Sequence, residues 1–112
     1  MDAFNSSSTF VLVWDGHTSL NGFVVVQKVQ DESYIQNIMV DPENQGKGLG
    51  SRLIRLAVDW CGENGSRSVK LDVDFQNFPA IKIYEKAGFR TEGARPNAYP
   101  RGESALVMSK KL

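Results

Sequence analysis

The sequence contains one cysteine and one histidine, which removes two common kinds of site. Cys61 has no partner for an intrachain disulfide, and a single cysteine excludes a cysteine-rich zinc module. With His17 as the only histidine, a histidine-based metal site is not expected either, and we predict no metal. Unpaired cysteine is typical of a reducing compartment, so we expect the protein to be cytoplasmic.

An excess of charge of one sign is also missing, because 13 Lys and Arg balance 13 Asp and Glu. Proteins that bind nucleic-acid backbones usually carry a basic excess, so we expect no nucleic-acid partner. No apolar run approaches the length of a membrane-spanning helix, and the N-terminal segment lacks the basic start of a signal peptide. We therefore expect no membrane partner. A hydrophobic content of 41% in 112 residues predicts one globular domain.

The hydrophobic pattern changes its period along the chain and predicts six strands and two helices. Apolar runs and apolar–charged alternation, bounded by turn-forming residues, indicate the strands. Apolar residues at helical spacing, followed by glycine, indicate the helices. The predicted strands cover residues 10–14, 23–29, 34–40, 68–75, 89–92 and 104–109, and the predicted helices cover residues 49–61 and 79–87. This order predicts an α/β (α+β) fold with a mixed sheet, preceded by a polar, flexible segment over residues 1–8.

Three alternating glycines stand between the third predicted strand and the first predicted helix, in the segment QGKGLG over residues 45–50. Without Cβ atoms, their amides can approach a ligand closely, and the following helix adds the positive end of its dipole. Together these features predict a cradle for phosphate or pyrophosphate. A turn that only connects two elements is the alternative. The spacing does not fit a P-loop, and the dinucleotide fingerprint fails at Ser51.

This segment resembles the acyl-CoA pyrophosphate loop of the GNAT superfamily of N-acetyltransferases. Residues 77–89, NFPAIKIYEKAGF, resemble a second block of that family, with Asn, Ala, Tyr and Gly-Phe at the family's spacings. The resemblance covers residues 9–112, which we identify as a single GNAT-like domain with a mostly antiparallel sheet. A complete family domain begins with a strand and two helices. This sequence starts almost directly at the first hairpin, so we expect a compact form without them.

The resemblance implies acetyl-CoA as co-substrate and a primary amine as acceptor: a small amine, a lysine side chain or a protein N-terminus. In the family, loop amides hold the pyrophosphate, the edge of the third strand pairs with the pantetheine amides, and one amide there points at the thioester oxygen. For Asn77, a contact to the cofactor and an N-cap role are compatible. The implied cofactor-binding residues are Ile38, Met39, Val40, Gln45, Gly46, Lys47, Gly48, Leu49, Gly50, Ser51, Asn77, Ala80 and Tyr84.

The resemblance assigns Tyr84 as the general acid that protonates the departing CoA thiolate, a task that suits a phenol because it is protonated at neutral pH. The general base is less defined. Many relatives carry a glutamate on the third strand, but residues 34–37 hold no carboxylate. Asp72 is the best substitute, since relatives resembling the ribosomal-protein N-terminal acetyltransferases have an acidic residue there. The alternatives are a solvated strand face at Asp72 and Asp74, and a base that acts through water.

Two further expectations concern partners and activity. The first two strands are continuously apolar and call for cover on both faces, which predicts a homodimer through the hairpin over residues 10–26. An acyl-CoA-binding module with little or no catalytic activity, acting with a partner, is the alternative to an N-acetyltransferase. A structural domain with an empty glycine turn is a third hypothesis. Cys61 falls on the apolar face of its helix, which predicts a core position rather than an acyl-cysteine mechanism.

Overall fold

A computed structural model describes residues 7–15, 20–41 and 48–112. Its six-stranded sheet has the order β1-β2-β3-β4-β6-β5. Neighbouring strands are antiparallel except for β3 and β4, which are parallel. The strands are β1 (Ser7–Asp15), β2 (Leu20–Val29), β3 (Glu32–Val40), β4 (Ser68–Asp74), β5 (Arg90–Arg95) and β6 (Ala105–Lys111), and the helices are α1 (Leu49–Glu63) and α2 (Phe78–Lys86). The predicted mixed, mostly antiparallel sheet with two helices is confirmed.

Several strands are longer than their apolar residues predict, and β1 and β5 show the reason. β1 begins at Ser7, because Ser7 and Ser8 pair with Val29 and Lys28 of β2. The segment predicted to be flexible therefore includes two residues of a strand, and residues 1–6 lie outside the described ones. β5 continues to Arg95, inside a stretch predicted as a turn, because it pairs with β6. In both places the backbone pairs with a neighbouring strand whether or not the side chains are apolar.

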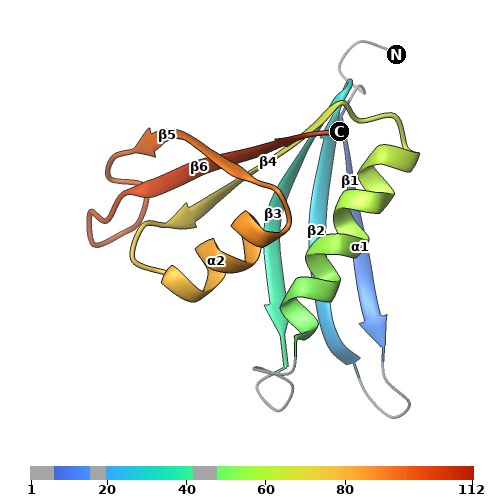
Figure 1. Cartoon of the computed structure of the whole chain (residues 1–112), viewed down its shortest axis with the longest axis horizontal. Coiled ribbons are helices and arrows are strands. Elements are labelled where there is room, and N and C mark those ends of the chain that lie inside the picture. Colours follow the sequence, from blue (N-terminus) through green and yellow to red (C-terminus); the bar gives the residue numbers. More distant parts are fainter. Residues whose placement is uncertain (1–6, 16–19, 42–47) are drawn as a thin grey trace.

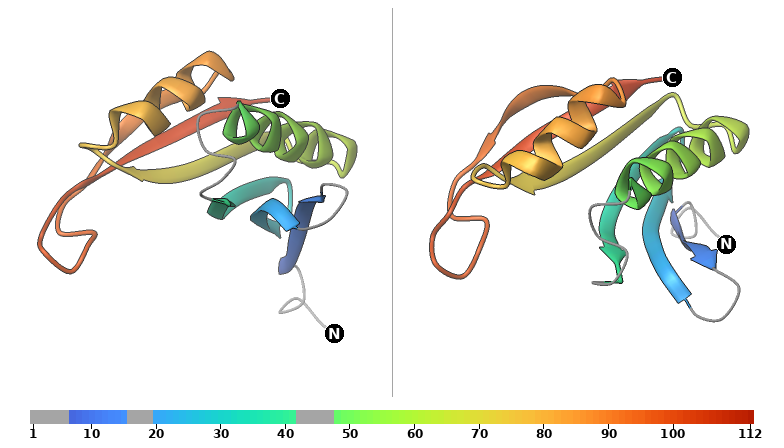
Figure 2. Two further views of the ribbon diagram at one scale, coloured as in Figure 1. Left: turned by 90° about the horizontal axis from the view of Figure 1, so that it is seen from below. Right: turned by 60° about the horizontal axis from the view of Figure 1, so that its bottom comes forward.

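Both helices lie on the same face of the sheet (Figure 2). The apolar stripe of α1 faces the sheet and supplies five buried residues, which are Leu49, Leu53, Ile54, Ala57 and Cys61. They pack with buried side chains of the central strands, such as Val24, Val26, Leu71 and Met108. At the edge of this core, the Phe10 ring on β1 lies 4.5 Å from the Trp60 ring on α1, centroid to centroid.

β3 and β4 run side by side for only four residue pairs, from Glu32–Ser68 to Ile35–Leu71. Directly after the last pair, the register of β3 with β2 shifts, so that Gln36 is the extra residue of a β-bulge. A bulge bends its strand and increases the local twist, which accounts for the divergence of β3 from β4 in Figure 1. The sheet is therefore open between its two central strands beyond Ile35.

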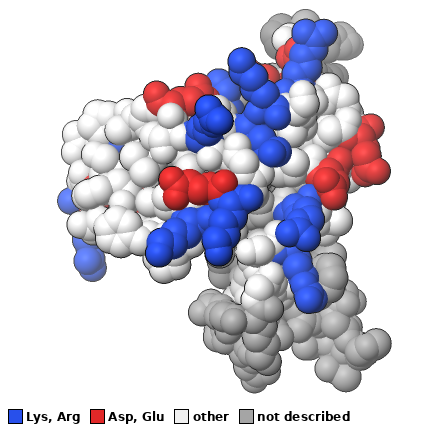
Figure 3. All heavy atoms as spheres, viewed as in Figure 1, with Lys and Arg blue, Asp and Glu red and all other residues white. Residues whose placement is uncertain are grey.

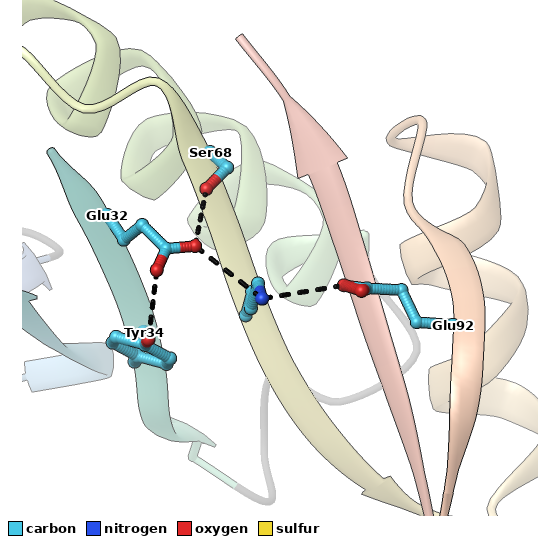
Figure 4. A network of polar contacts seen from close by, with 5 residues as sticks. Glu32, Tyr34, Ser68 and Glu92 are labelled. Carbon is cyan, nitrogen blue, oxygen red and sulfur yellow. Dashed lines mark hydrogen bonds and ion pairs between the residues drawn. The ribbon is translucent and has the colours of Figure 1, made fainter.

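A group of polar side chains ties the strands together where they are still paired (Figure 4). The Lys70 ammonium lies 3.5 Å from Glu32 Oε2 on β3 and 3.9 Å from Glu92 Oε1 on β5. The Ser68 and Tyr34 hydroxyls donate hydrogen bonds to Glu32. The bond from Ser68 is the main cause that lowers the pKa of Glu32, and the nearby charge of Lys70 acts in the same direction. No sequence pattern indicated a role for this group, which links β3, β4 and β5 at the closed end of the split sheet.

Candidate active site

A cavity of about 280 Å³ occupies the split between β3 and β4. Side chains from both strands, from α2 and from the loop between β5 and β6 meet around it. Four residues predicted for the site, Ile38, Asp72, Asn77 and Tyr84, line it together. The remaining lining residues are Ile35, Gln36, Asn37, Leu71, Val73, Asp74 and Tyr99. The fold thus brings residues that lie up to 64 positions apart in the sequence, from Ile35 to Tyr99, around one space.

Tyr84 is carried by α2, the helix that covers the C-terminal half of the sheet. The side chain is 7% exposed and packs edge-on against Phe89, with ring centroids 6.1 Å apart. Burial raises the pKa of Tyr84 above its ordinary value, and the neighbouring Tyr99 adds to the rise. A buried phenol at the wall of a cavity keeps its proton at neutral pH and can give it to a group that gains negative charge there.

The two aspartates of β4 have different surroundings. Asp74 Oδ1 accepts a hydrogen bond of 2.9 Å from the backbone N–H of Gln76 and so stabilises the turn before α2. Asp72 lies on the opposite sheet face from Leu71 and Val73, which are buried under the helices. Its Oδ2 is 3.3 Å from Arg95 Nη1, and its side chain is 35% exposed. Both aspartates line the cavity, and Asp72 is the more accessible of the two, because Asp74 is half-buried.

Tyr99 was missed as a site residue by the sequence analysis. It belongs to the loop between β5 and β6, where the backbone N–H groups of Ala98 and Tyr99 both donate to the Glu103 carbonyl. Burial raises the pKa of Tyr99, and the charges of Asp74 and Asp72 raise it further. The segment NAYP, which resembles a Tyr-rich loop of ribosomal-protein acetyltransferases, was the signal available in the sequence.

The N-terminus of α1 follows the glycine-rich segment. Gly48 is the N-cap residue, with φ of +81°, and a Cβ at this position would meet no atom of the described residues within 4 Å. Open space therefore lies beside the first amides of the helix, which have no partners within the helix. Ser51 is half-buried, while Leu49 is buried and points into the core. The other predicted loop residues, Gln45, Gly46 and Lys47, lie outside the described residues.

The remaining predicted cofactor residues are not all at the split. Asn77 is the N-cap residue of α2, and its Oδ1 accepts a hydrogen bond of 3.3 Å from the Ala80 N–H. Ala80 packs against the core and does not line the cavity. Met39 is 51% exposed on β3, which has no register partner in β4 from Gln36 to Met39. This edge is the part of β3 that an extended ligand could reach.

A groove of about 340 Å³ runs between α1 and α2, close to the N-terminus of α1. Three cations and one carboxylate line it: Arg55 and Asp59 from α1, where Ser51 also contributes, Lys86 from α2 and Lys110 from β6. Among the described residues, none of these three cations has an ion-pair partner. Figure 3 shows Lys and Arg side chains gathered over this helical face. The groove can therefore attract an anion that extends from the start of α1.

A larger cavity, of about 700 Å³, shares five lining residues with the cavity in the split, which are Ile35, Gln36, Leu71, Asp72 and Tyr99. Its other lining side chains include Gln27, Tyr34, Lys70 and Arg95. Since Asp72 faces away from the helices, this cavity lies on the face of the sheet that the two helices leave uncovered. The two cavities meet at Asp72 and Tyr99, so two ligands that enter from opposite faces can come together there.

Other potential reactive groups do not contribute to this site. Cys61 is fully buried, as predicted, and burial raises the pKa of its thiol, which disfavours the thiolate. His17 lies outside the described residues. No group of three or more His, Cys, Asp or Glu side chains suited to a metal ion occurs in the part of the chain that the structure describes. Neither described helix has the length and apolarity that crossing a bilayer requires.

Several known proteins are similar to this chain in sequence and in fold. A protein of Bacillus subtilis described as a putative ribosomal protein bS18-alanine N-acetyltransferase is 40% identical over 99 residues, which are 88% of this chain and 64% of the relative. The streptothricin acetyltransferase of Streptomyces lavendulae is 38% identical over 110 residues, 92% of this chain and 57% of that protein. The crystal structure of the ribosomal-protein-S18-alanine N-acetyltransferase from Escherichia coli superimposes with a TM-score of 0.83 and 33% identity, covering 96% of this chain and 70% of that one.

The chain spans about 60% of the length of these curated relatives. The two relatives are named for different acceptors, ribosomal protein bS18 and streptothricin. The sequence model of the Acetyltransferase (GNAT) family matches residues 1–89, which include the glycine-rich segment and the whole second block. This match and the relatives above show that the chain belongs to the GNAT acetyltransferase family.

Proposed function

We propose that this chain transfers the acetyl group of acetyl-CoA to a primary amine by direct attack. The observation that carries the proposal is the cavity in the split sheet, where a buried phenol and an accessible carboxylate meet between two approach routes. Asp72 is suited to take a proton from the acceptor's ammonium group, so that the neutral amine can attack the thioester, and Tyr84 is suited to give a proton to the departing thiolate. The reaction needs one general base and one general acid, and here β4 carries the first and α2 the second.

The described residues fit acetyl-CoA. Its phosphates would lie at the open N-terminus of α1, held by backbone amides of residues 48–51, with Gln45, Gly46 and Lys47 alongside. Arg55, Lys86 and Lys110, which have no ion-pair partner within the described part of the chain, offer positive charge in the neighbouring groove between the helices. The edge of β3 at Ile38 and Met39 can pair with the amide-bearing arm, and Asn77 lines the space where the thioester would end.

A polypeptide N-terminus is the acceptor that the larger cavity fits best. Its lining combines tyrosines, glutamines, Lys70, Asp72 and Arg95 with four apolar residues, which are Ile35, Leu71, Ala98 and Val107. The polar groups can bind the backbone amides directly next to an N-terminal amine, which the four-carbon stem of a lysine side chain lacks. The names of two relatives support a polypeptide acceptor, since both refer to an alanine of ribosomal protein bS18.

The direct test measures CoA thiol release with acetyl-CoA and synthetic peptides that begin with a free alanine. We expect turnover with these peptides and none when the same N-terminus is blocked. A panel of free lysine and small polyamines establishes selectivity. Binding of acetyl-CoA without thiol release on any amine would contradict the enzymatic proposal and favour an acyl-CoA-binding module.

Replacing Gly48 with valine is expected to weaken CoA binding at least tenfold, or about 1.4 kcal/mol. The new side chain would project into the open space beside the first amides of α1. Because φ is +81° at Gly48, a β-branched residue is also strained there, by about 1–2 kcal/mol. Isothermal titration calorimetry measures the affinity, and thermal unfolding measures the strain.

Gly65 provides the matched control for this substitution. It follows the same helix at its other end, has φ of +88°, and a Cβ there would also meet nothing within 4 Å. Gly65→Val should lose similar stability and keep CoA affinity. Equal affinities for the two variants would contradict the placement of the pyrophosphate at Gly48.

We also propose that the chain works as a homodimer in the cytoplasm. β1 is an edge strand of the described sheet, with Val11 58% and Phe10 37% exposed. A second copy could cover them, while the side chains of residues 12–21 lie outside the described ones. Because Val11 is exposed in the single chain, Val11→Asp should produce a folded monomer. Sedimentation equilibrium at micromolar concentration decides this, and a monomeric wild type would refute the dimer.

A further inference from the structure

Arg95 reaches Asp72 across an intervening strand. Asp72 on β4 is the register partner of Val107 on β6, and Val107 is the partner of Gly93 on β5. Arg95 follows Gly93 by two residues and so projects from the same face of the sheet. The two residues stand two strands apart, about 10 Å between the strands, and the long guanidinium side chain closes this distance to 3.3 Å.

The surroundings leave a clear path for this contact. Gly93 has no side chain beside Val107, and a Cβ there would meet no atom within 4 Å. Lys70 lies two residues before Asp72 on the same strand face, but Glu32 and Glu92 hold its ammonium. Arg95 is therefore the cation that pairs with Asp72 among the described residues. Arg95 is also the last residue of β5, so the pair anchors the loop that carries Tyr99.

We propose that Arg95 is a positioning residue for the acetyl transfer described above, on which this inference rests. It holds the Asp72 carboxylate through Oδ2. Among the described residues no side chain hydrogen-bonds Oδ1, so this oxygen is left for the ammonium of the acceptor. Fixing one oxygen orients the other toward the junction of the two cavities. Arg95 therefore acts on the amine through Asp72 and needs no contact with acetyl-CoA.

The test is a double-mutant cycle on the rate of acetylation of a peptide with a free N-terminal alanine. Arg95→Gln should lower kcat/KM for the peptide on the order of tenfold, because a misoriented group loses part of its catalytic effect. The KM for acetyl-CoA should stay unchanged. Arg95→Lys keeps the charge and should recover part of the rate. In an Asp72→Asn background, Arg95→Gln should have no further effect.

Arg67→Gln is the matched control, because Arg67 forms an exposed ion pair of 3.6 Å with Asp31, away from both cavities. It should keep the wild-type rate. Circular dichroism and thermal unfolding establish that each variant is folded. Additive effects of the two substitutions, or an Arg95→Gln enzyme with wild-type kcat/KM, would overturn the role of Arg95. A folded wild type that acetylates no amine would instead contradict the proposed function itself.

Discussion

Replacing Tyr84 with phenylalanine is expected to lower kcat by roughly 100-fold and to leave acetyl-CoA affinity nearly unchanged. The substitution removes the hydroxyl and keeps the ring that packs against Phe89. Burial, reinforced by Tyr99, raises the pKa of Tyr84 from its ordinary value of 10.0. The phenol therefore stays protonated through neutral and mildly alkaline pH, and the acid should be available over that whole range. Steady-state kinetics and calorimetric titration with acetyl-CoA measure the two quantities.

Measuring kcat and acetyl-CoA affinity separately distinguishes two roles of the Tyr84 hydroxyl, proton donation and ligand binding. A fall in affinity together with kcat would mean that the hydroxyl holds the ligand in the ground state instead of donating a proton to the leaving group. A folded Tyr84→Phe enzyme with wild-type kcat would show that the thiolate leaves without this proton or takes it from another group.

Asp72→Asn is expected to reduce kcat by a similar factor, roughly 100-fold at neutral pH. Asparagine has nearly the same shape, but it cannot take the proton that the acceptor's ammonium group must lose before the amine attacks. The defect should shrink as pH rises, because a growing fraction of the acceptor amine then loses its proton to solvent. A pH series of kcat for wild type and variant, from pH 7 to about pH 9.5, measures this convergence.

Asp74→Asn is the comparison, since Asp74 stabilises the turn before α2 through its bond to Gln76 N–H. An asparagine oxygen can still accept that bond, so this variant should remain close to wild type. If Asp74→Asn were the slower enzyme, the base would be Asp74, two residues after Asp72 on β4. A parallel loss at every pH for Asp72→Asn would instead indicate a role in orienting the amine.

The sequence predicted the elements well where periodicity and chemistry agree. The alternation over 68–75 placed Val69, Leu71 and Val73 in the core, and the structure buries all three. Helical spacing from Leu49 likewise predicted four of the five buried residues of α1 but missed Ile54, and it included Leu56, which is 37% exposed. These patterns arise because one face of an element must leave water, so they are local and visible in a single sequence. Phe75 was counted in the same alternation but is 41% exposed, because β4 ends at Asp74.

The site was predictable only in part, because its geometry is not local. The glycine-rich segment and Tyr84 stood out through motifs. The split of the sheet depends on a bulge at Gln36 and on how few pairs join β3 to β4, and neither feature leaves a pattern in the residues. The Arg95–Asp72 pair depends on the register of three strands. Long-range register is fixed by packing, which single-sequence patterns do not contain.

The four-pair join between β3 and β4 also bears on the order in which the chain folds. β1, β2 and β3 pair as consecutive strands, and β5 pairs with β6 as the next along the chain. Such contacts close short loops and can form early. Ser68 and Glu32, which face each other across the join, are 36 residues apart, with α1 between them. The candidate site straddles this join, so neither half of the chain holds it alone, and it comes into existence when the two halves dock.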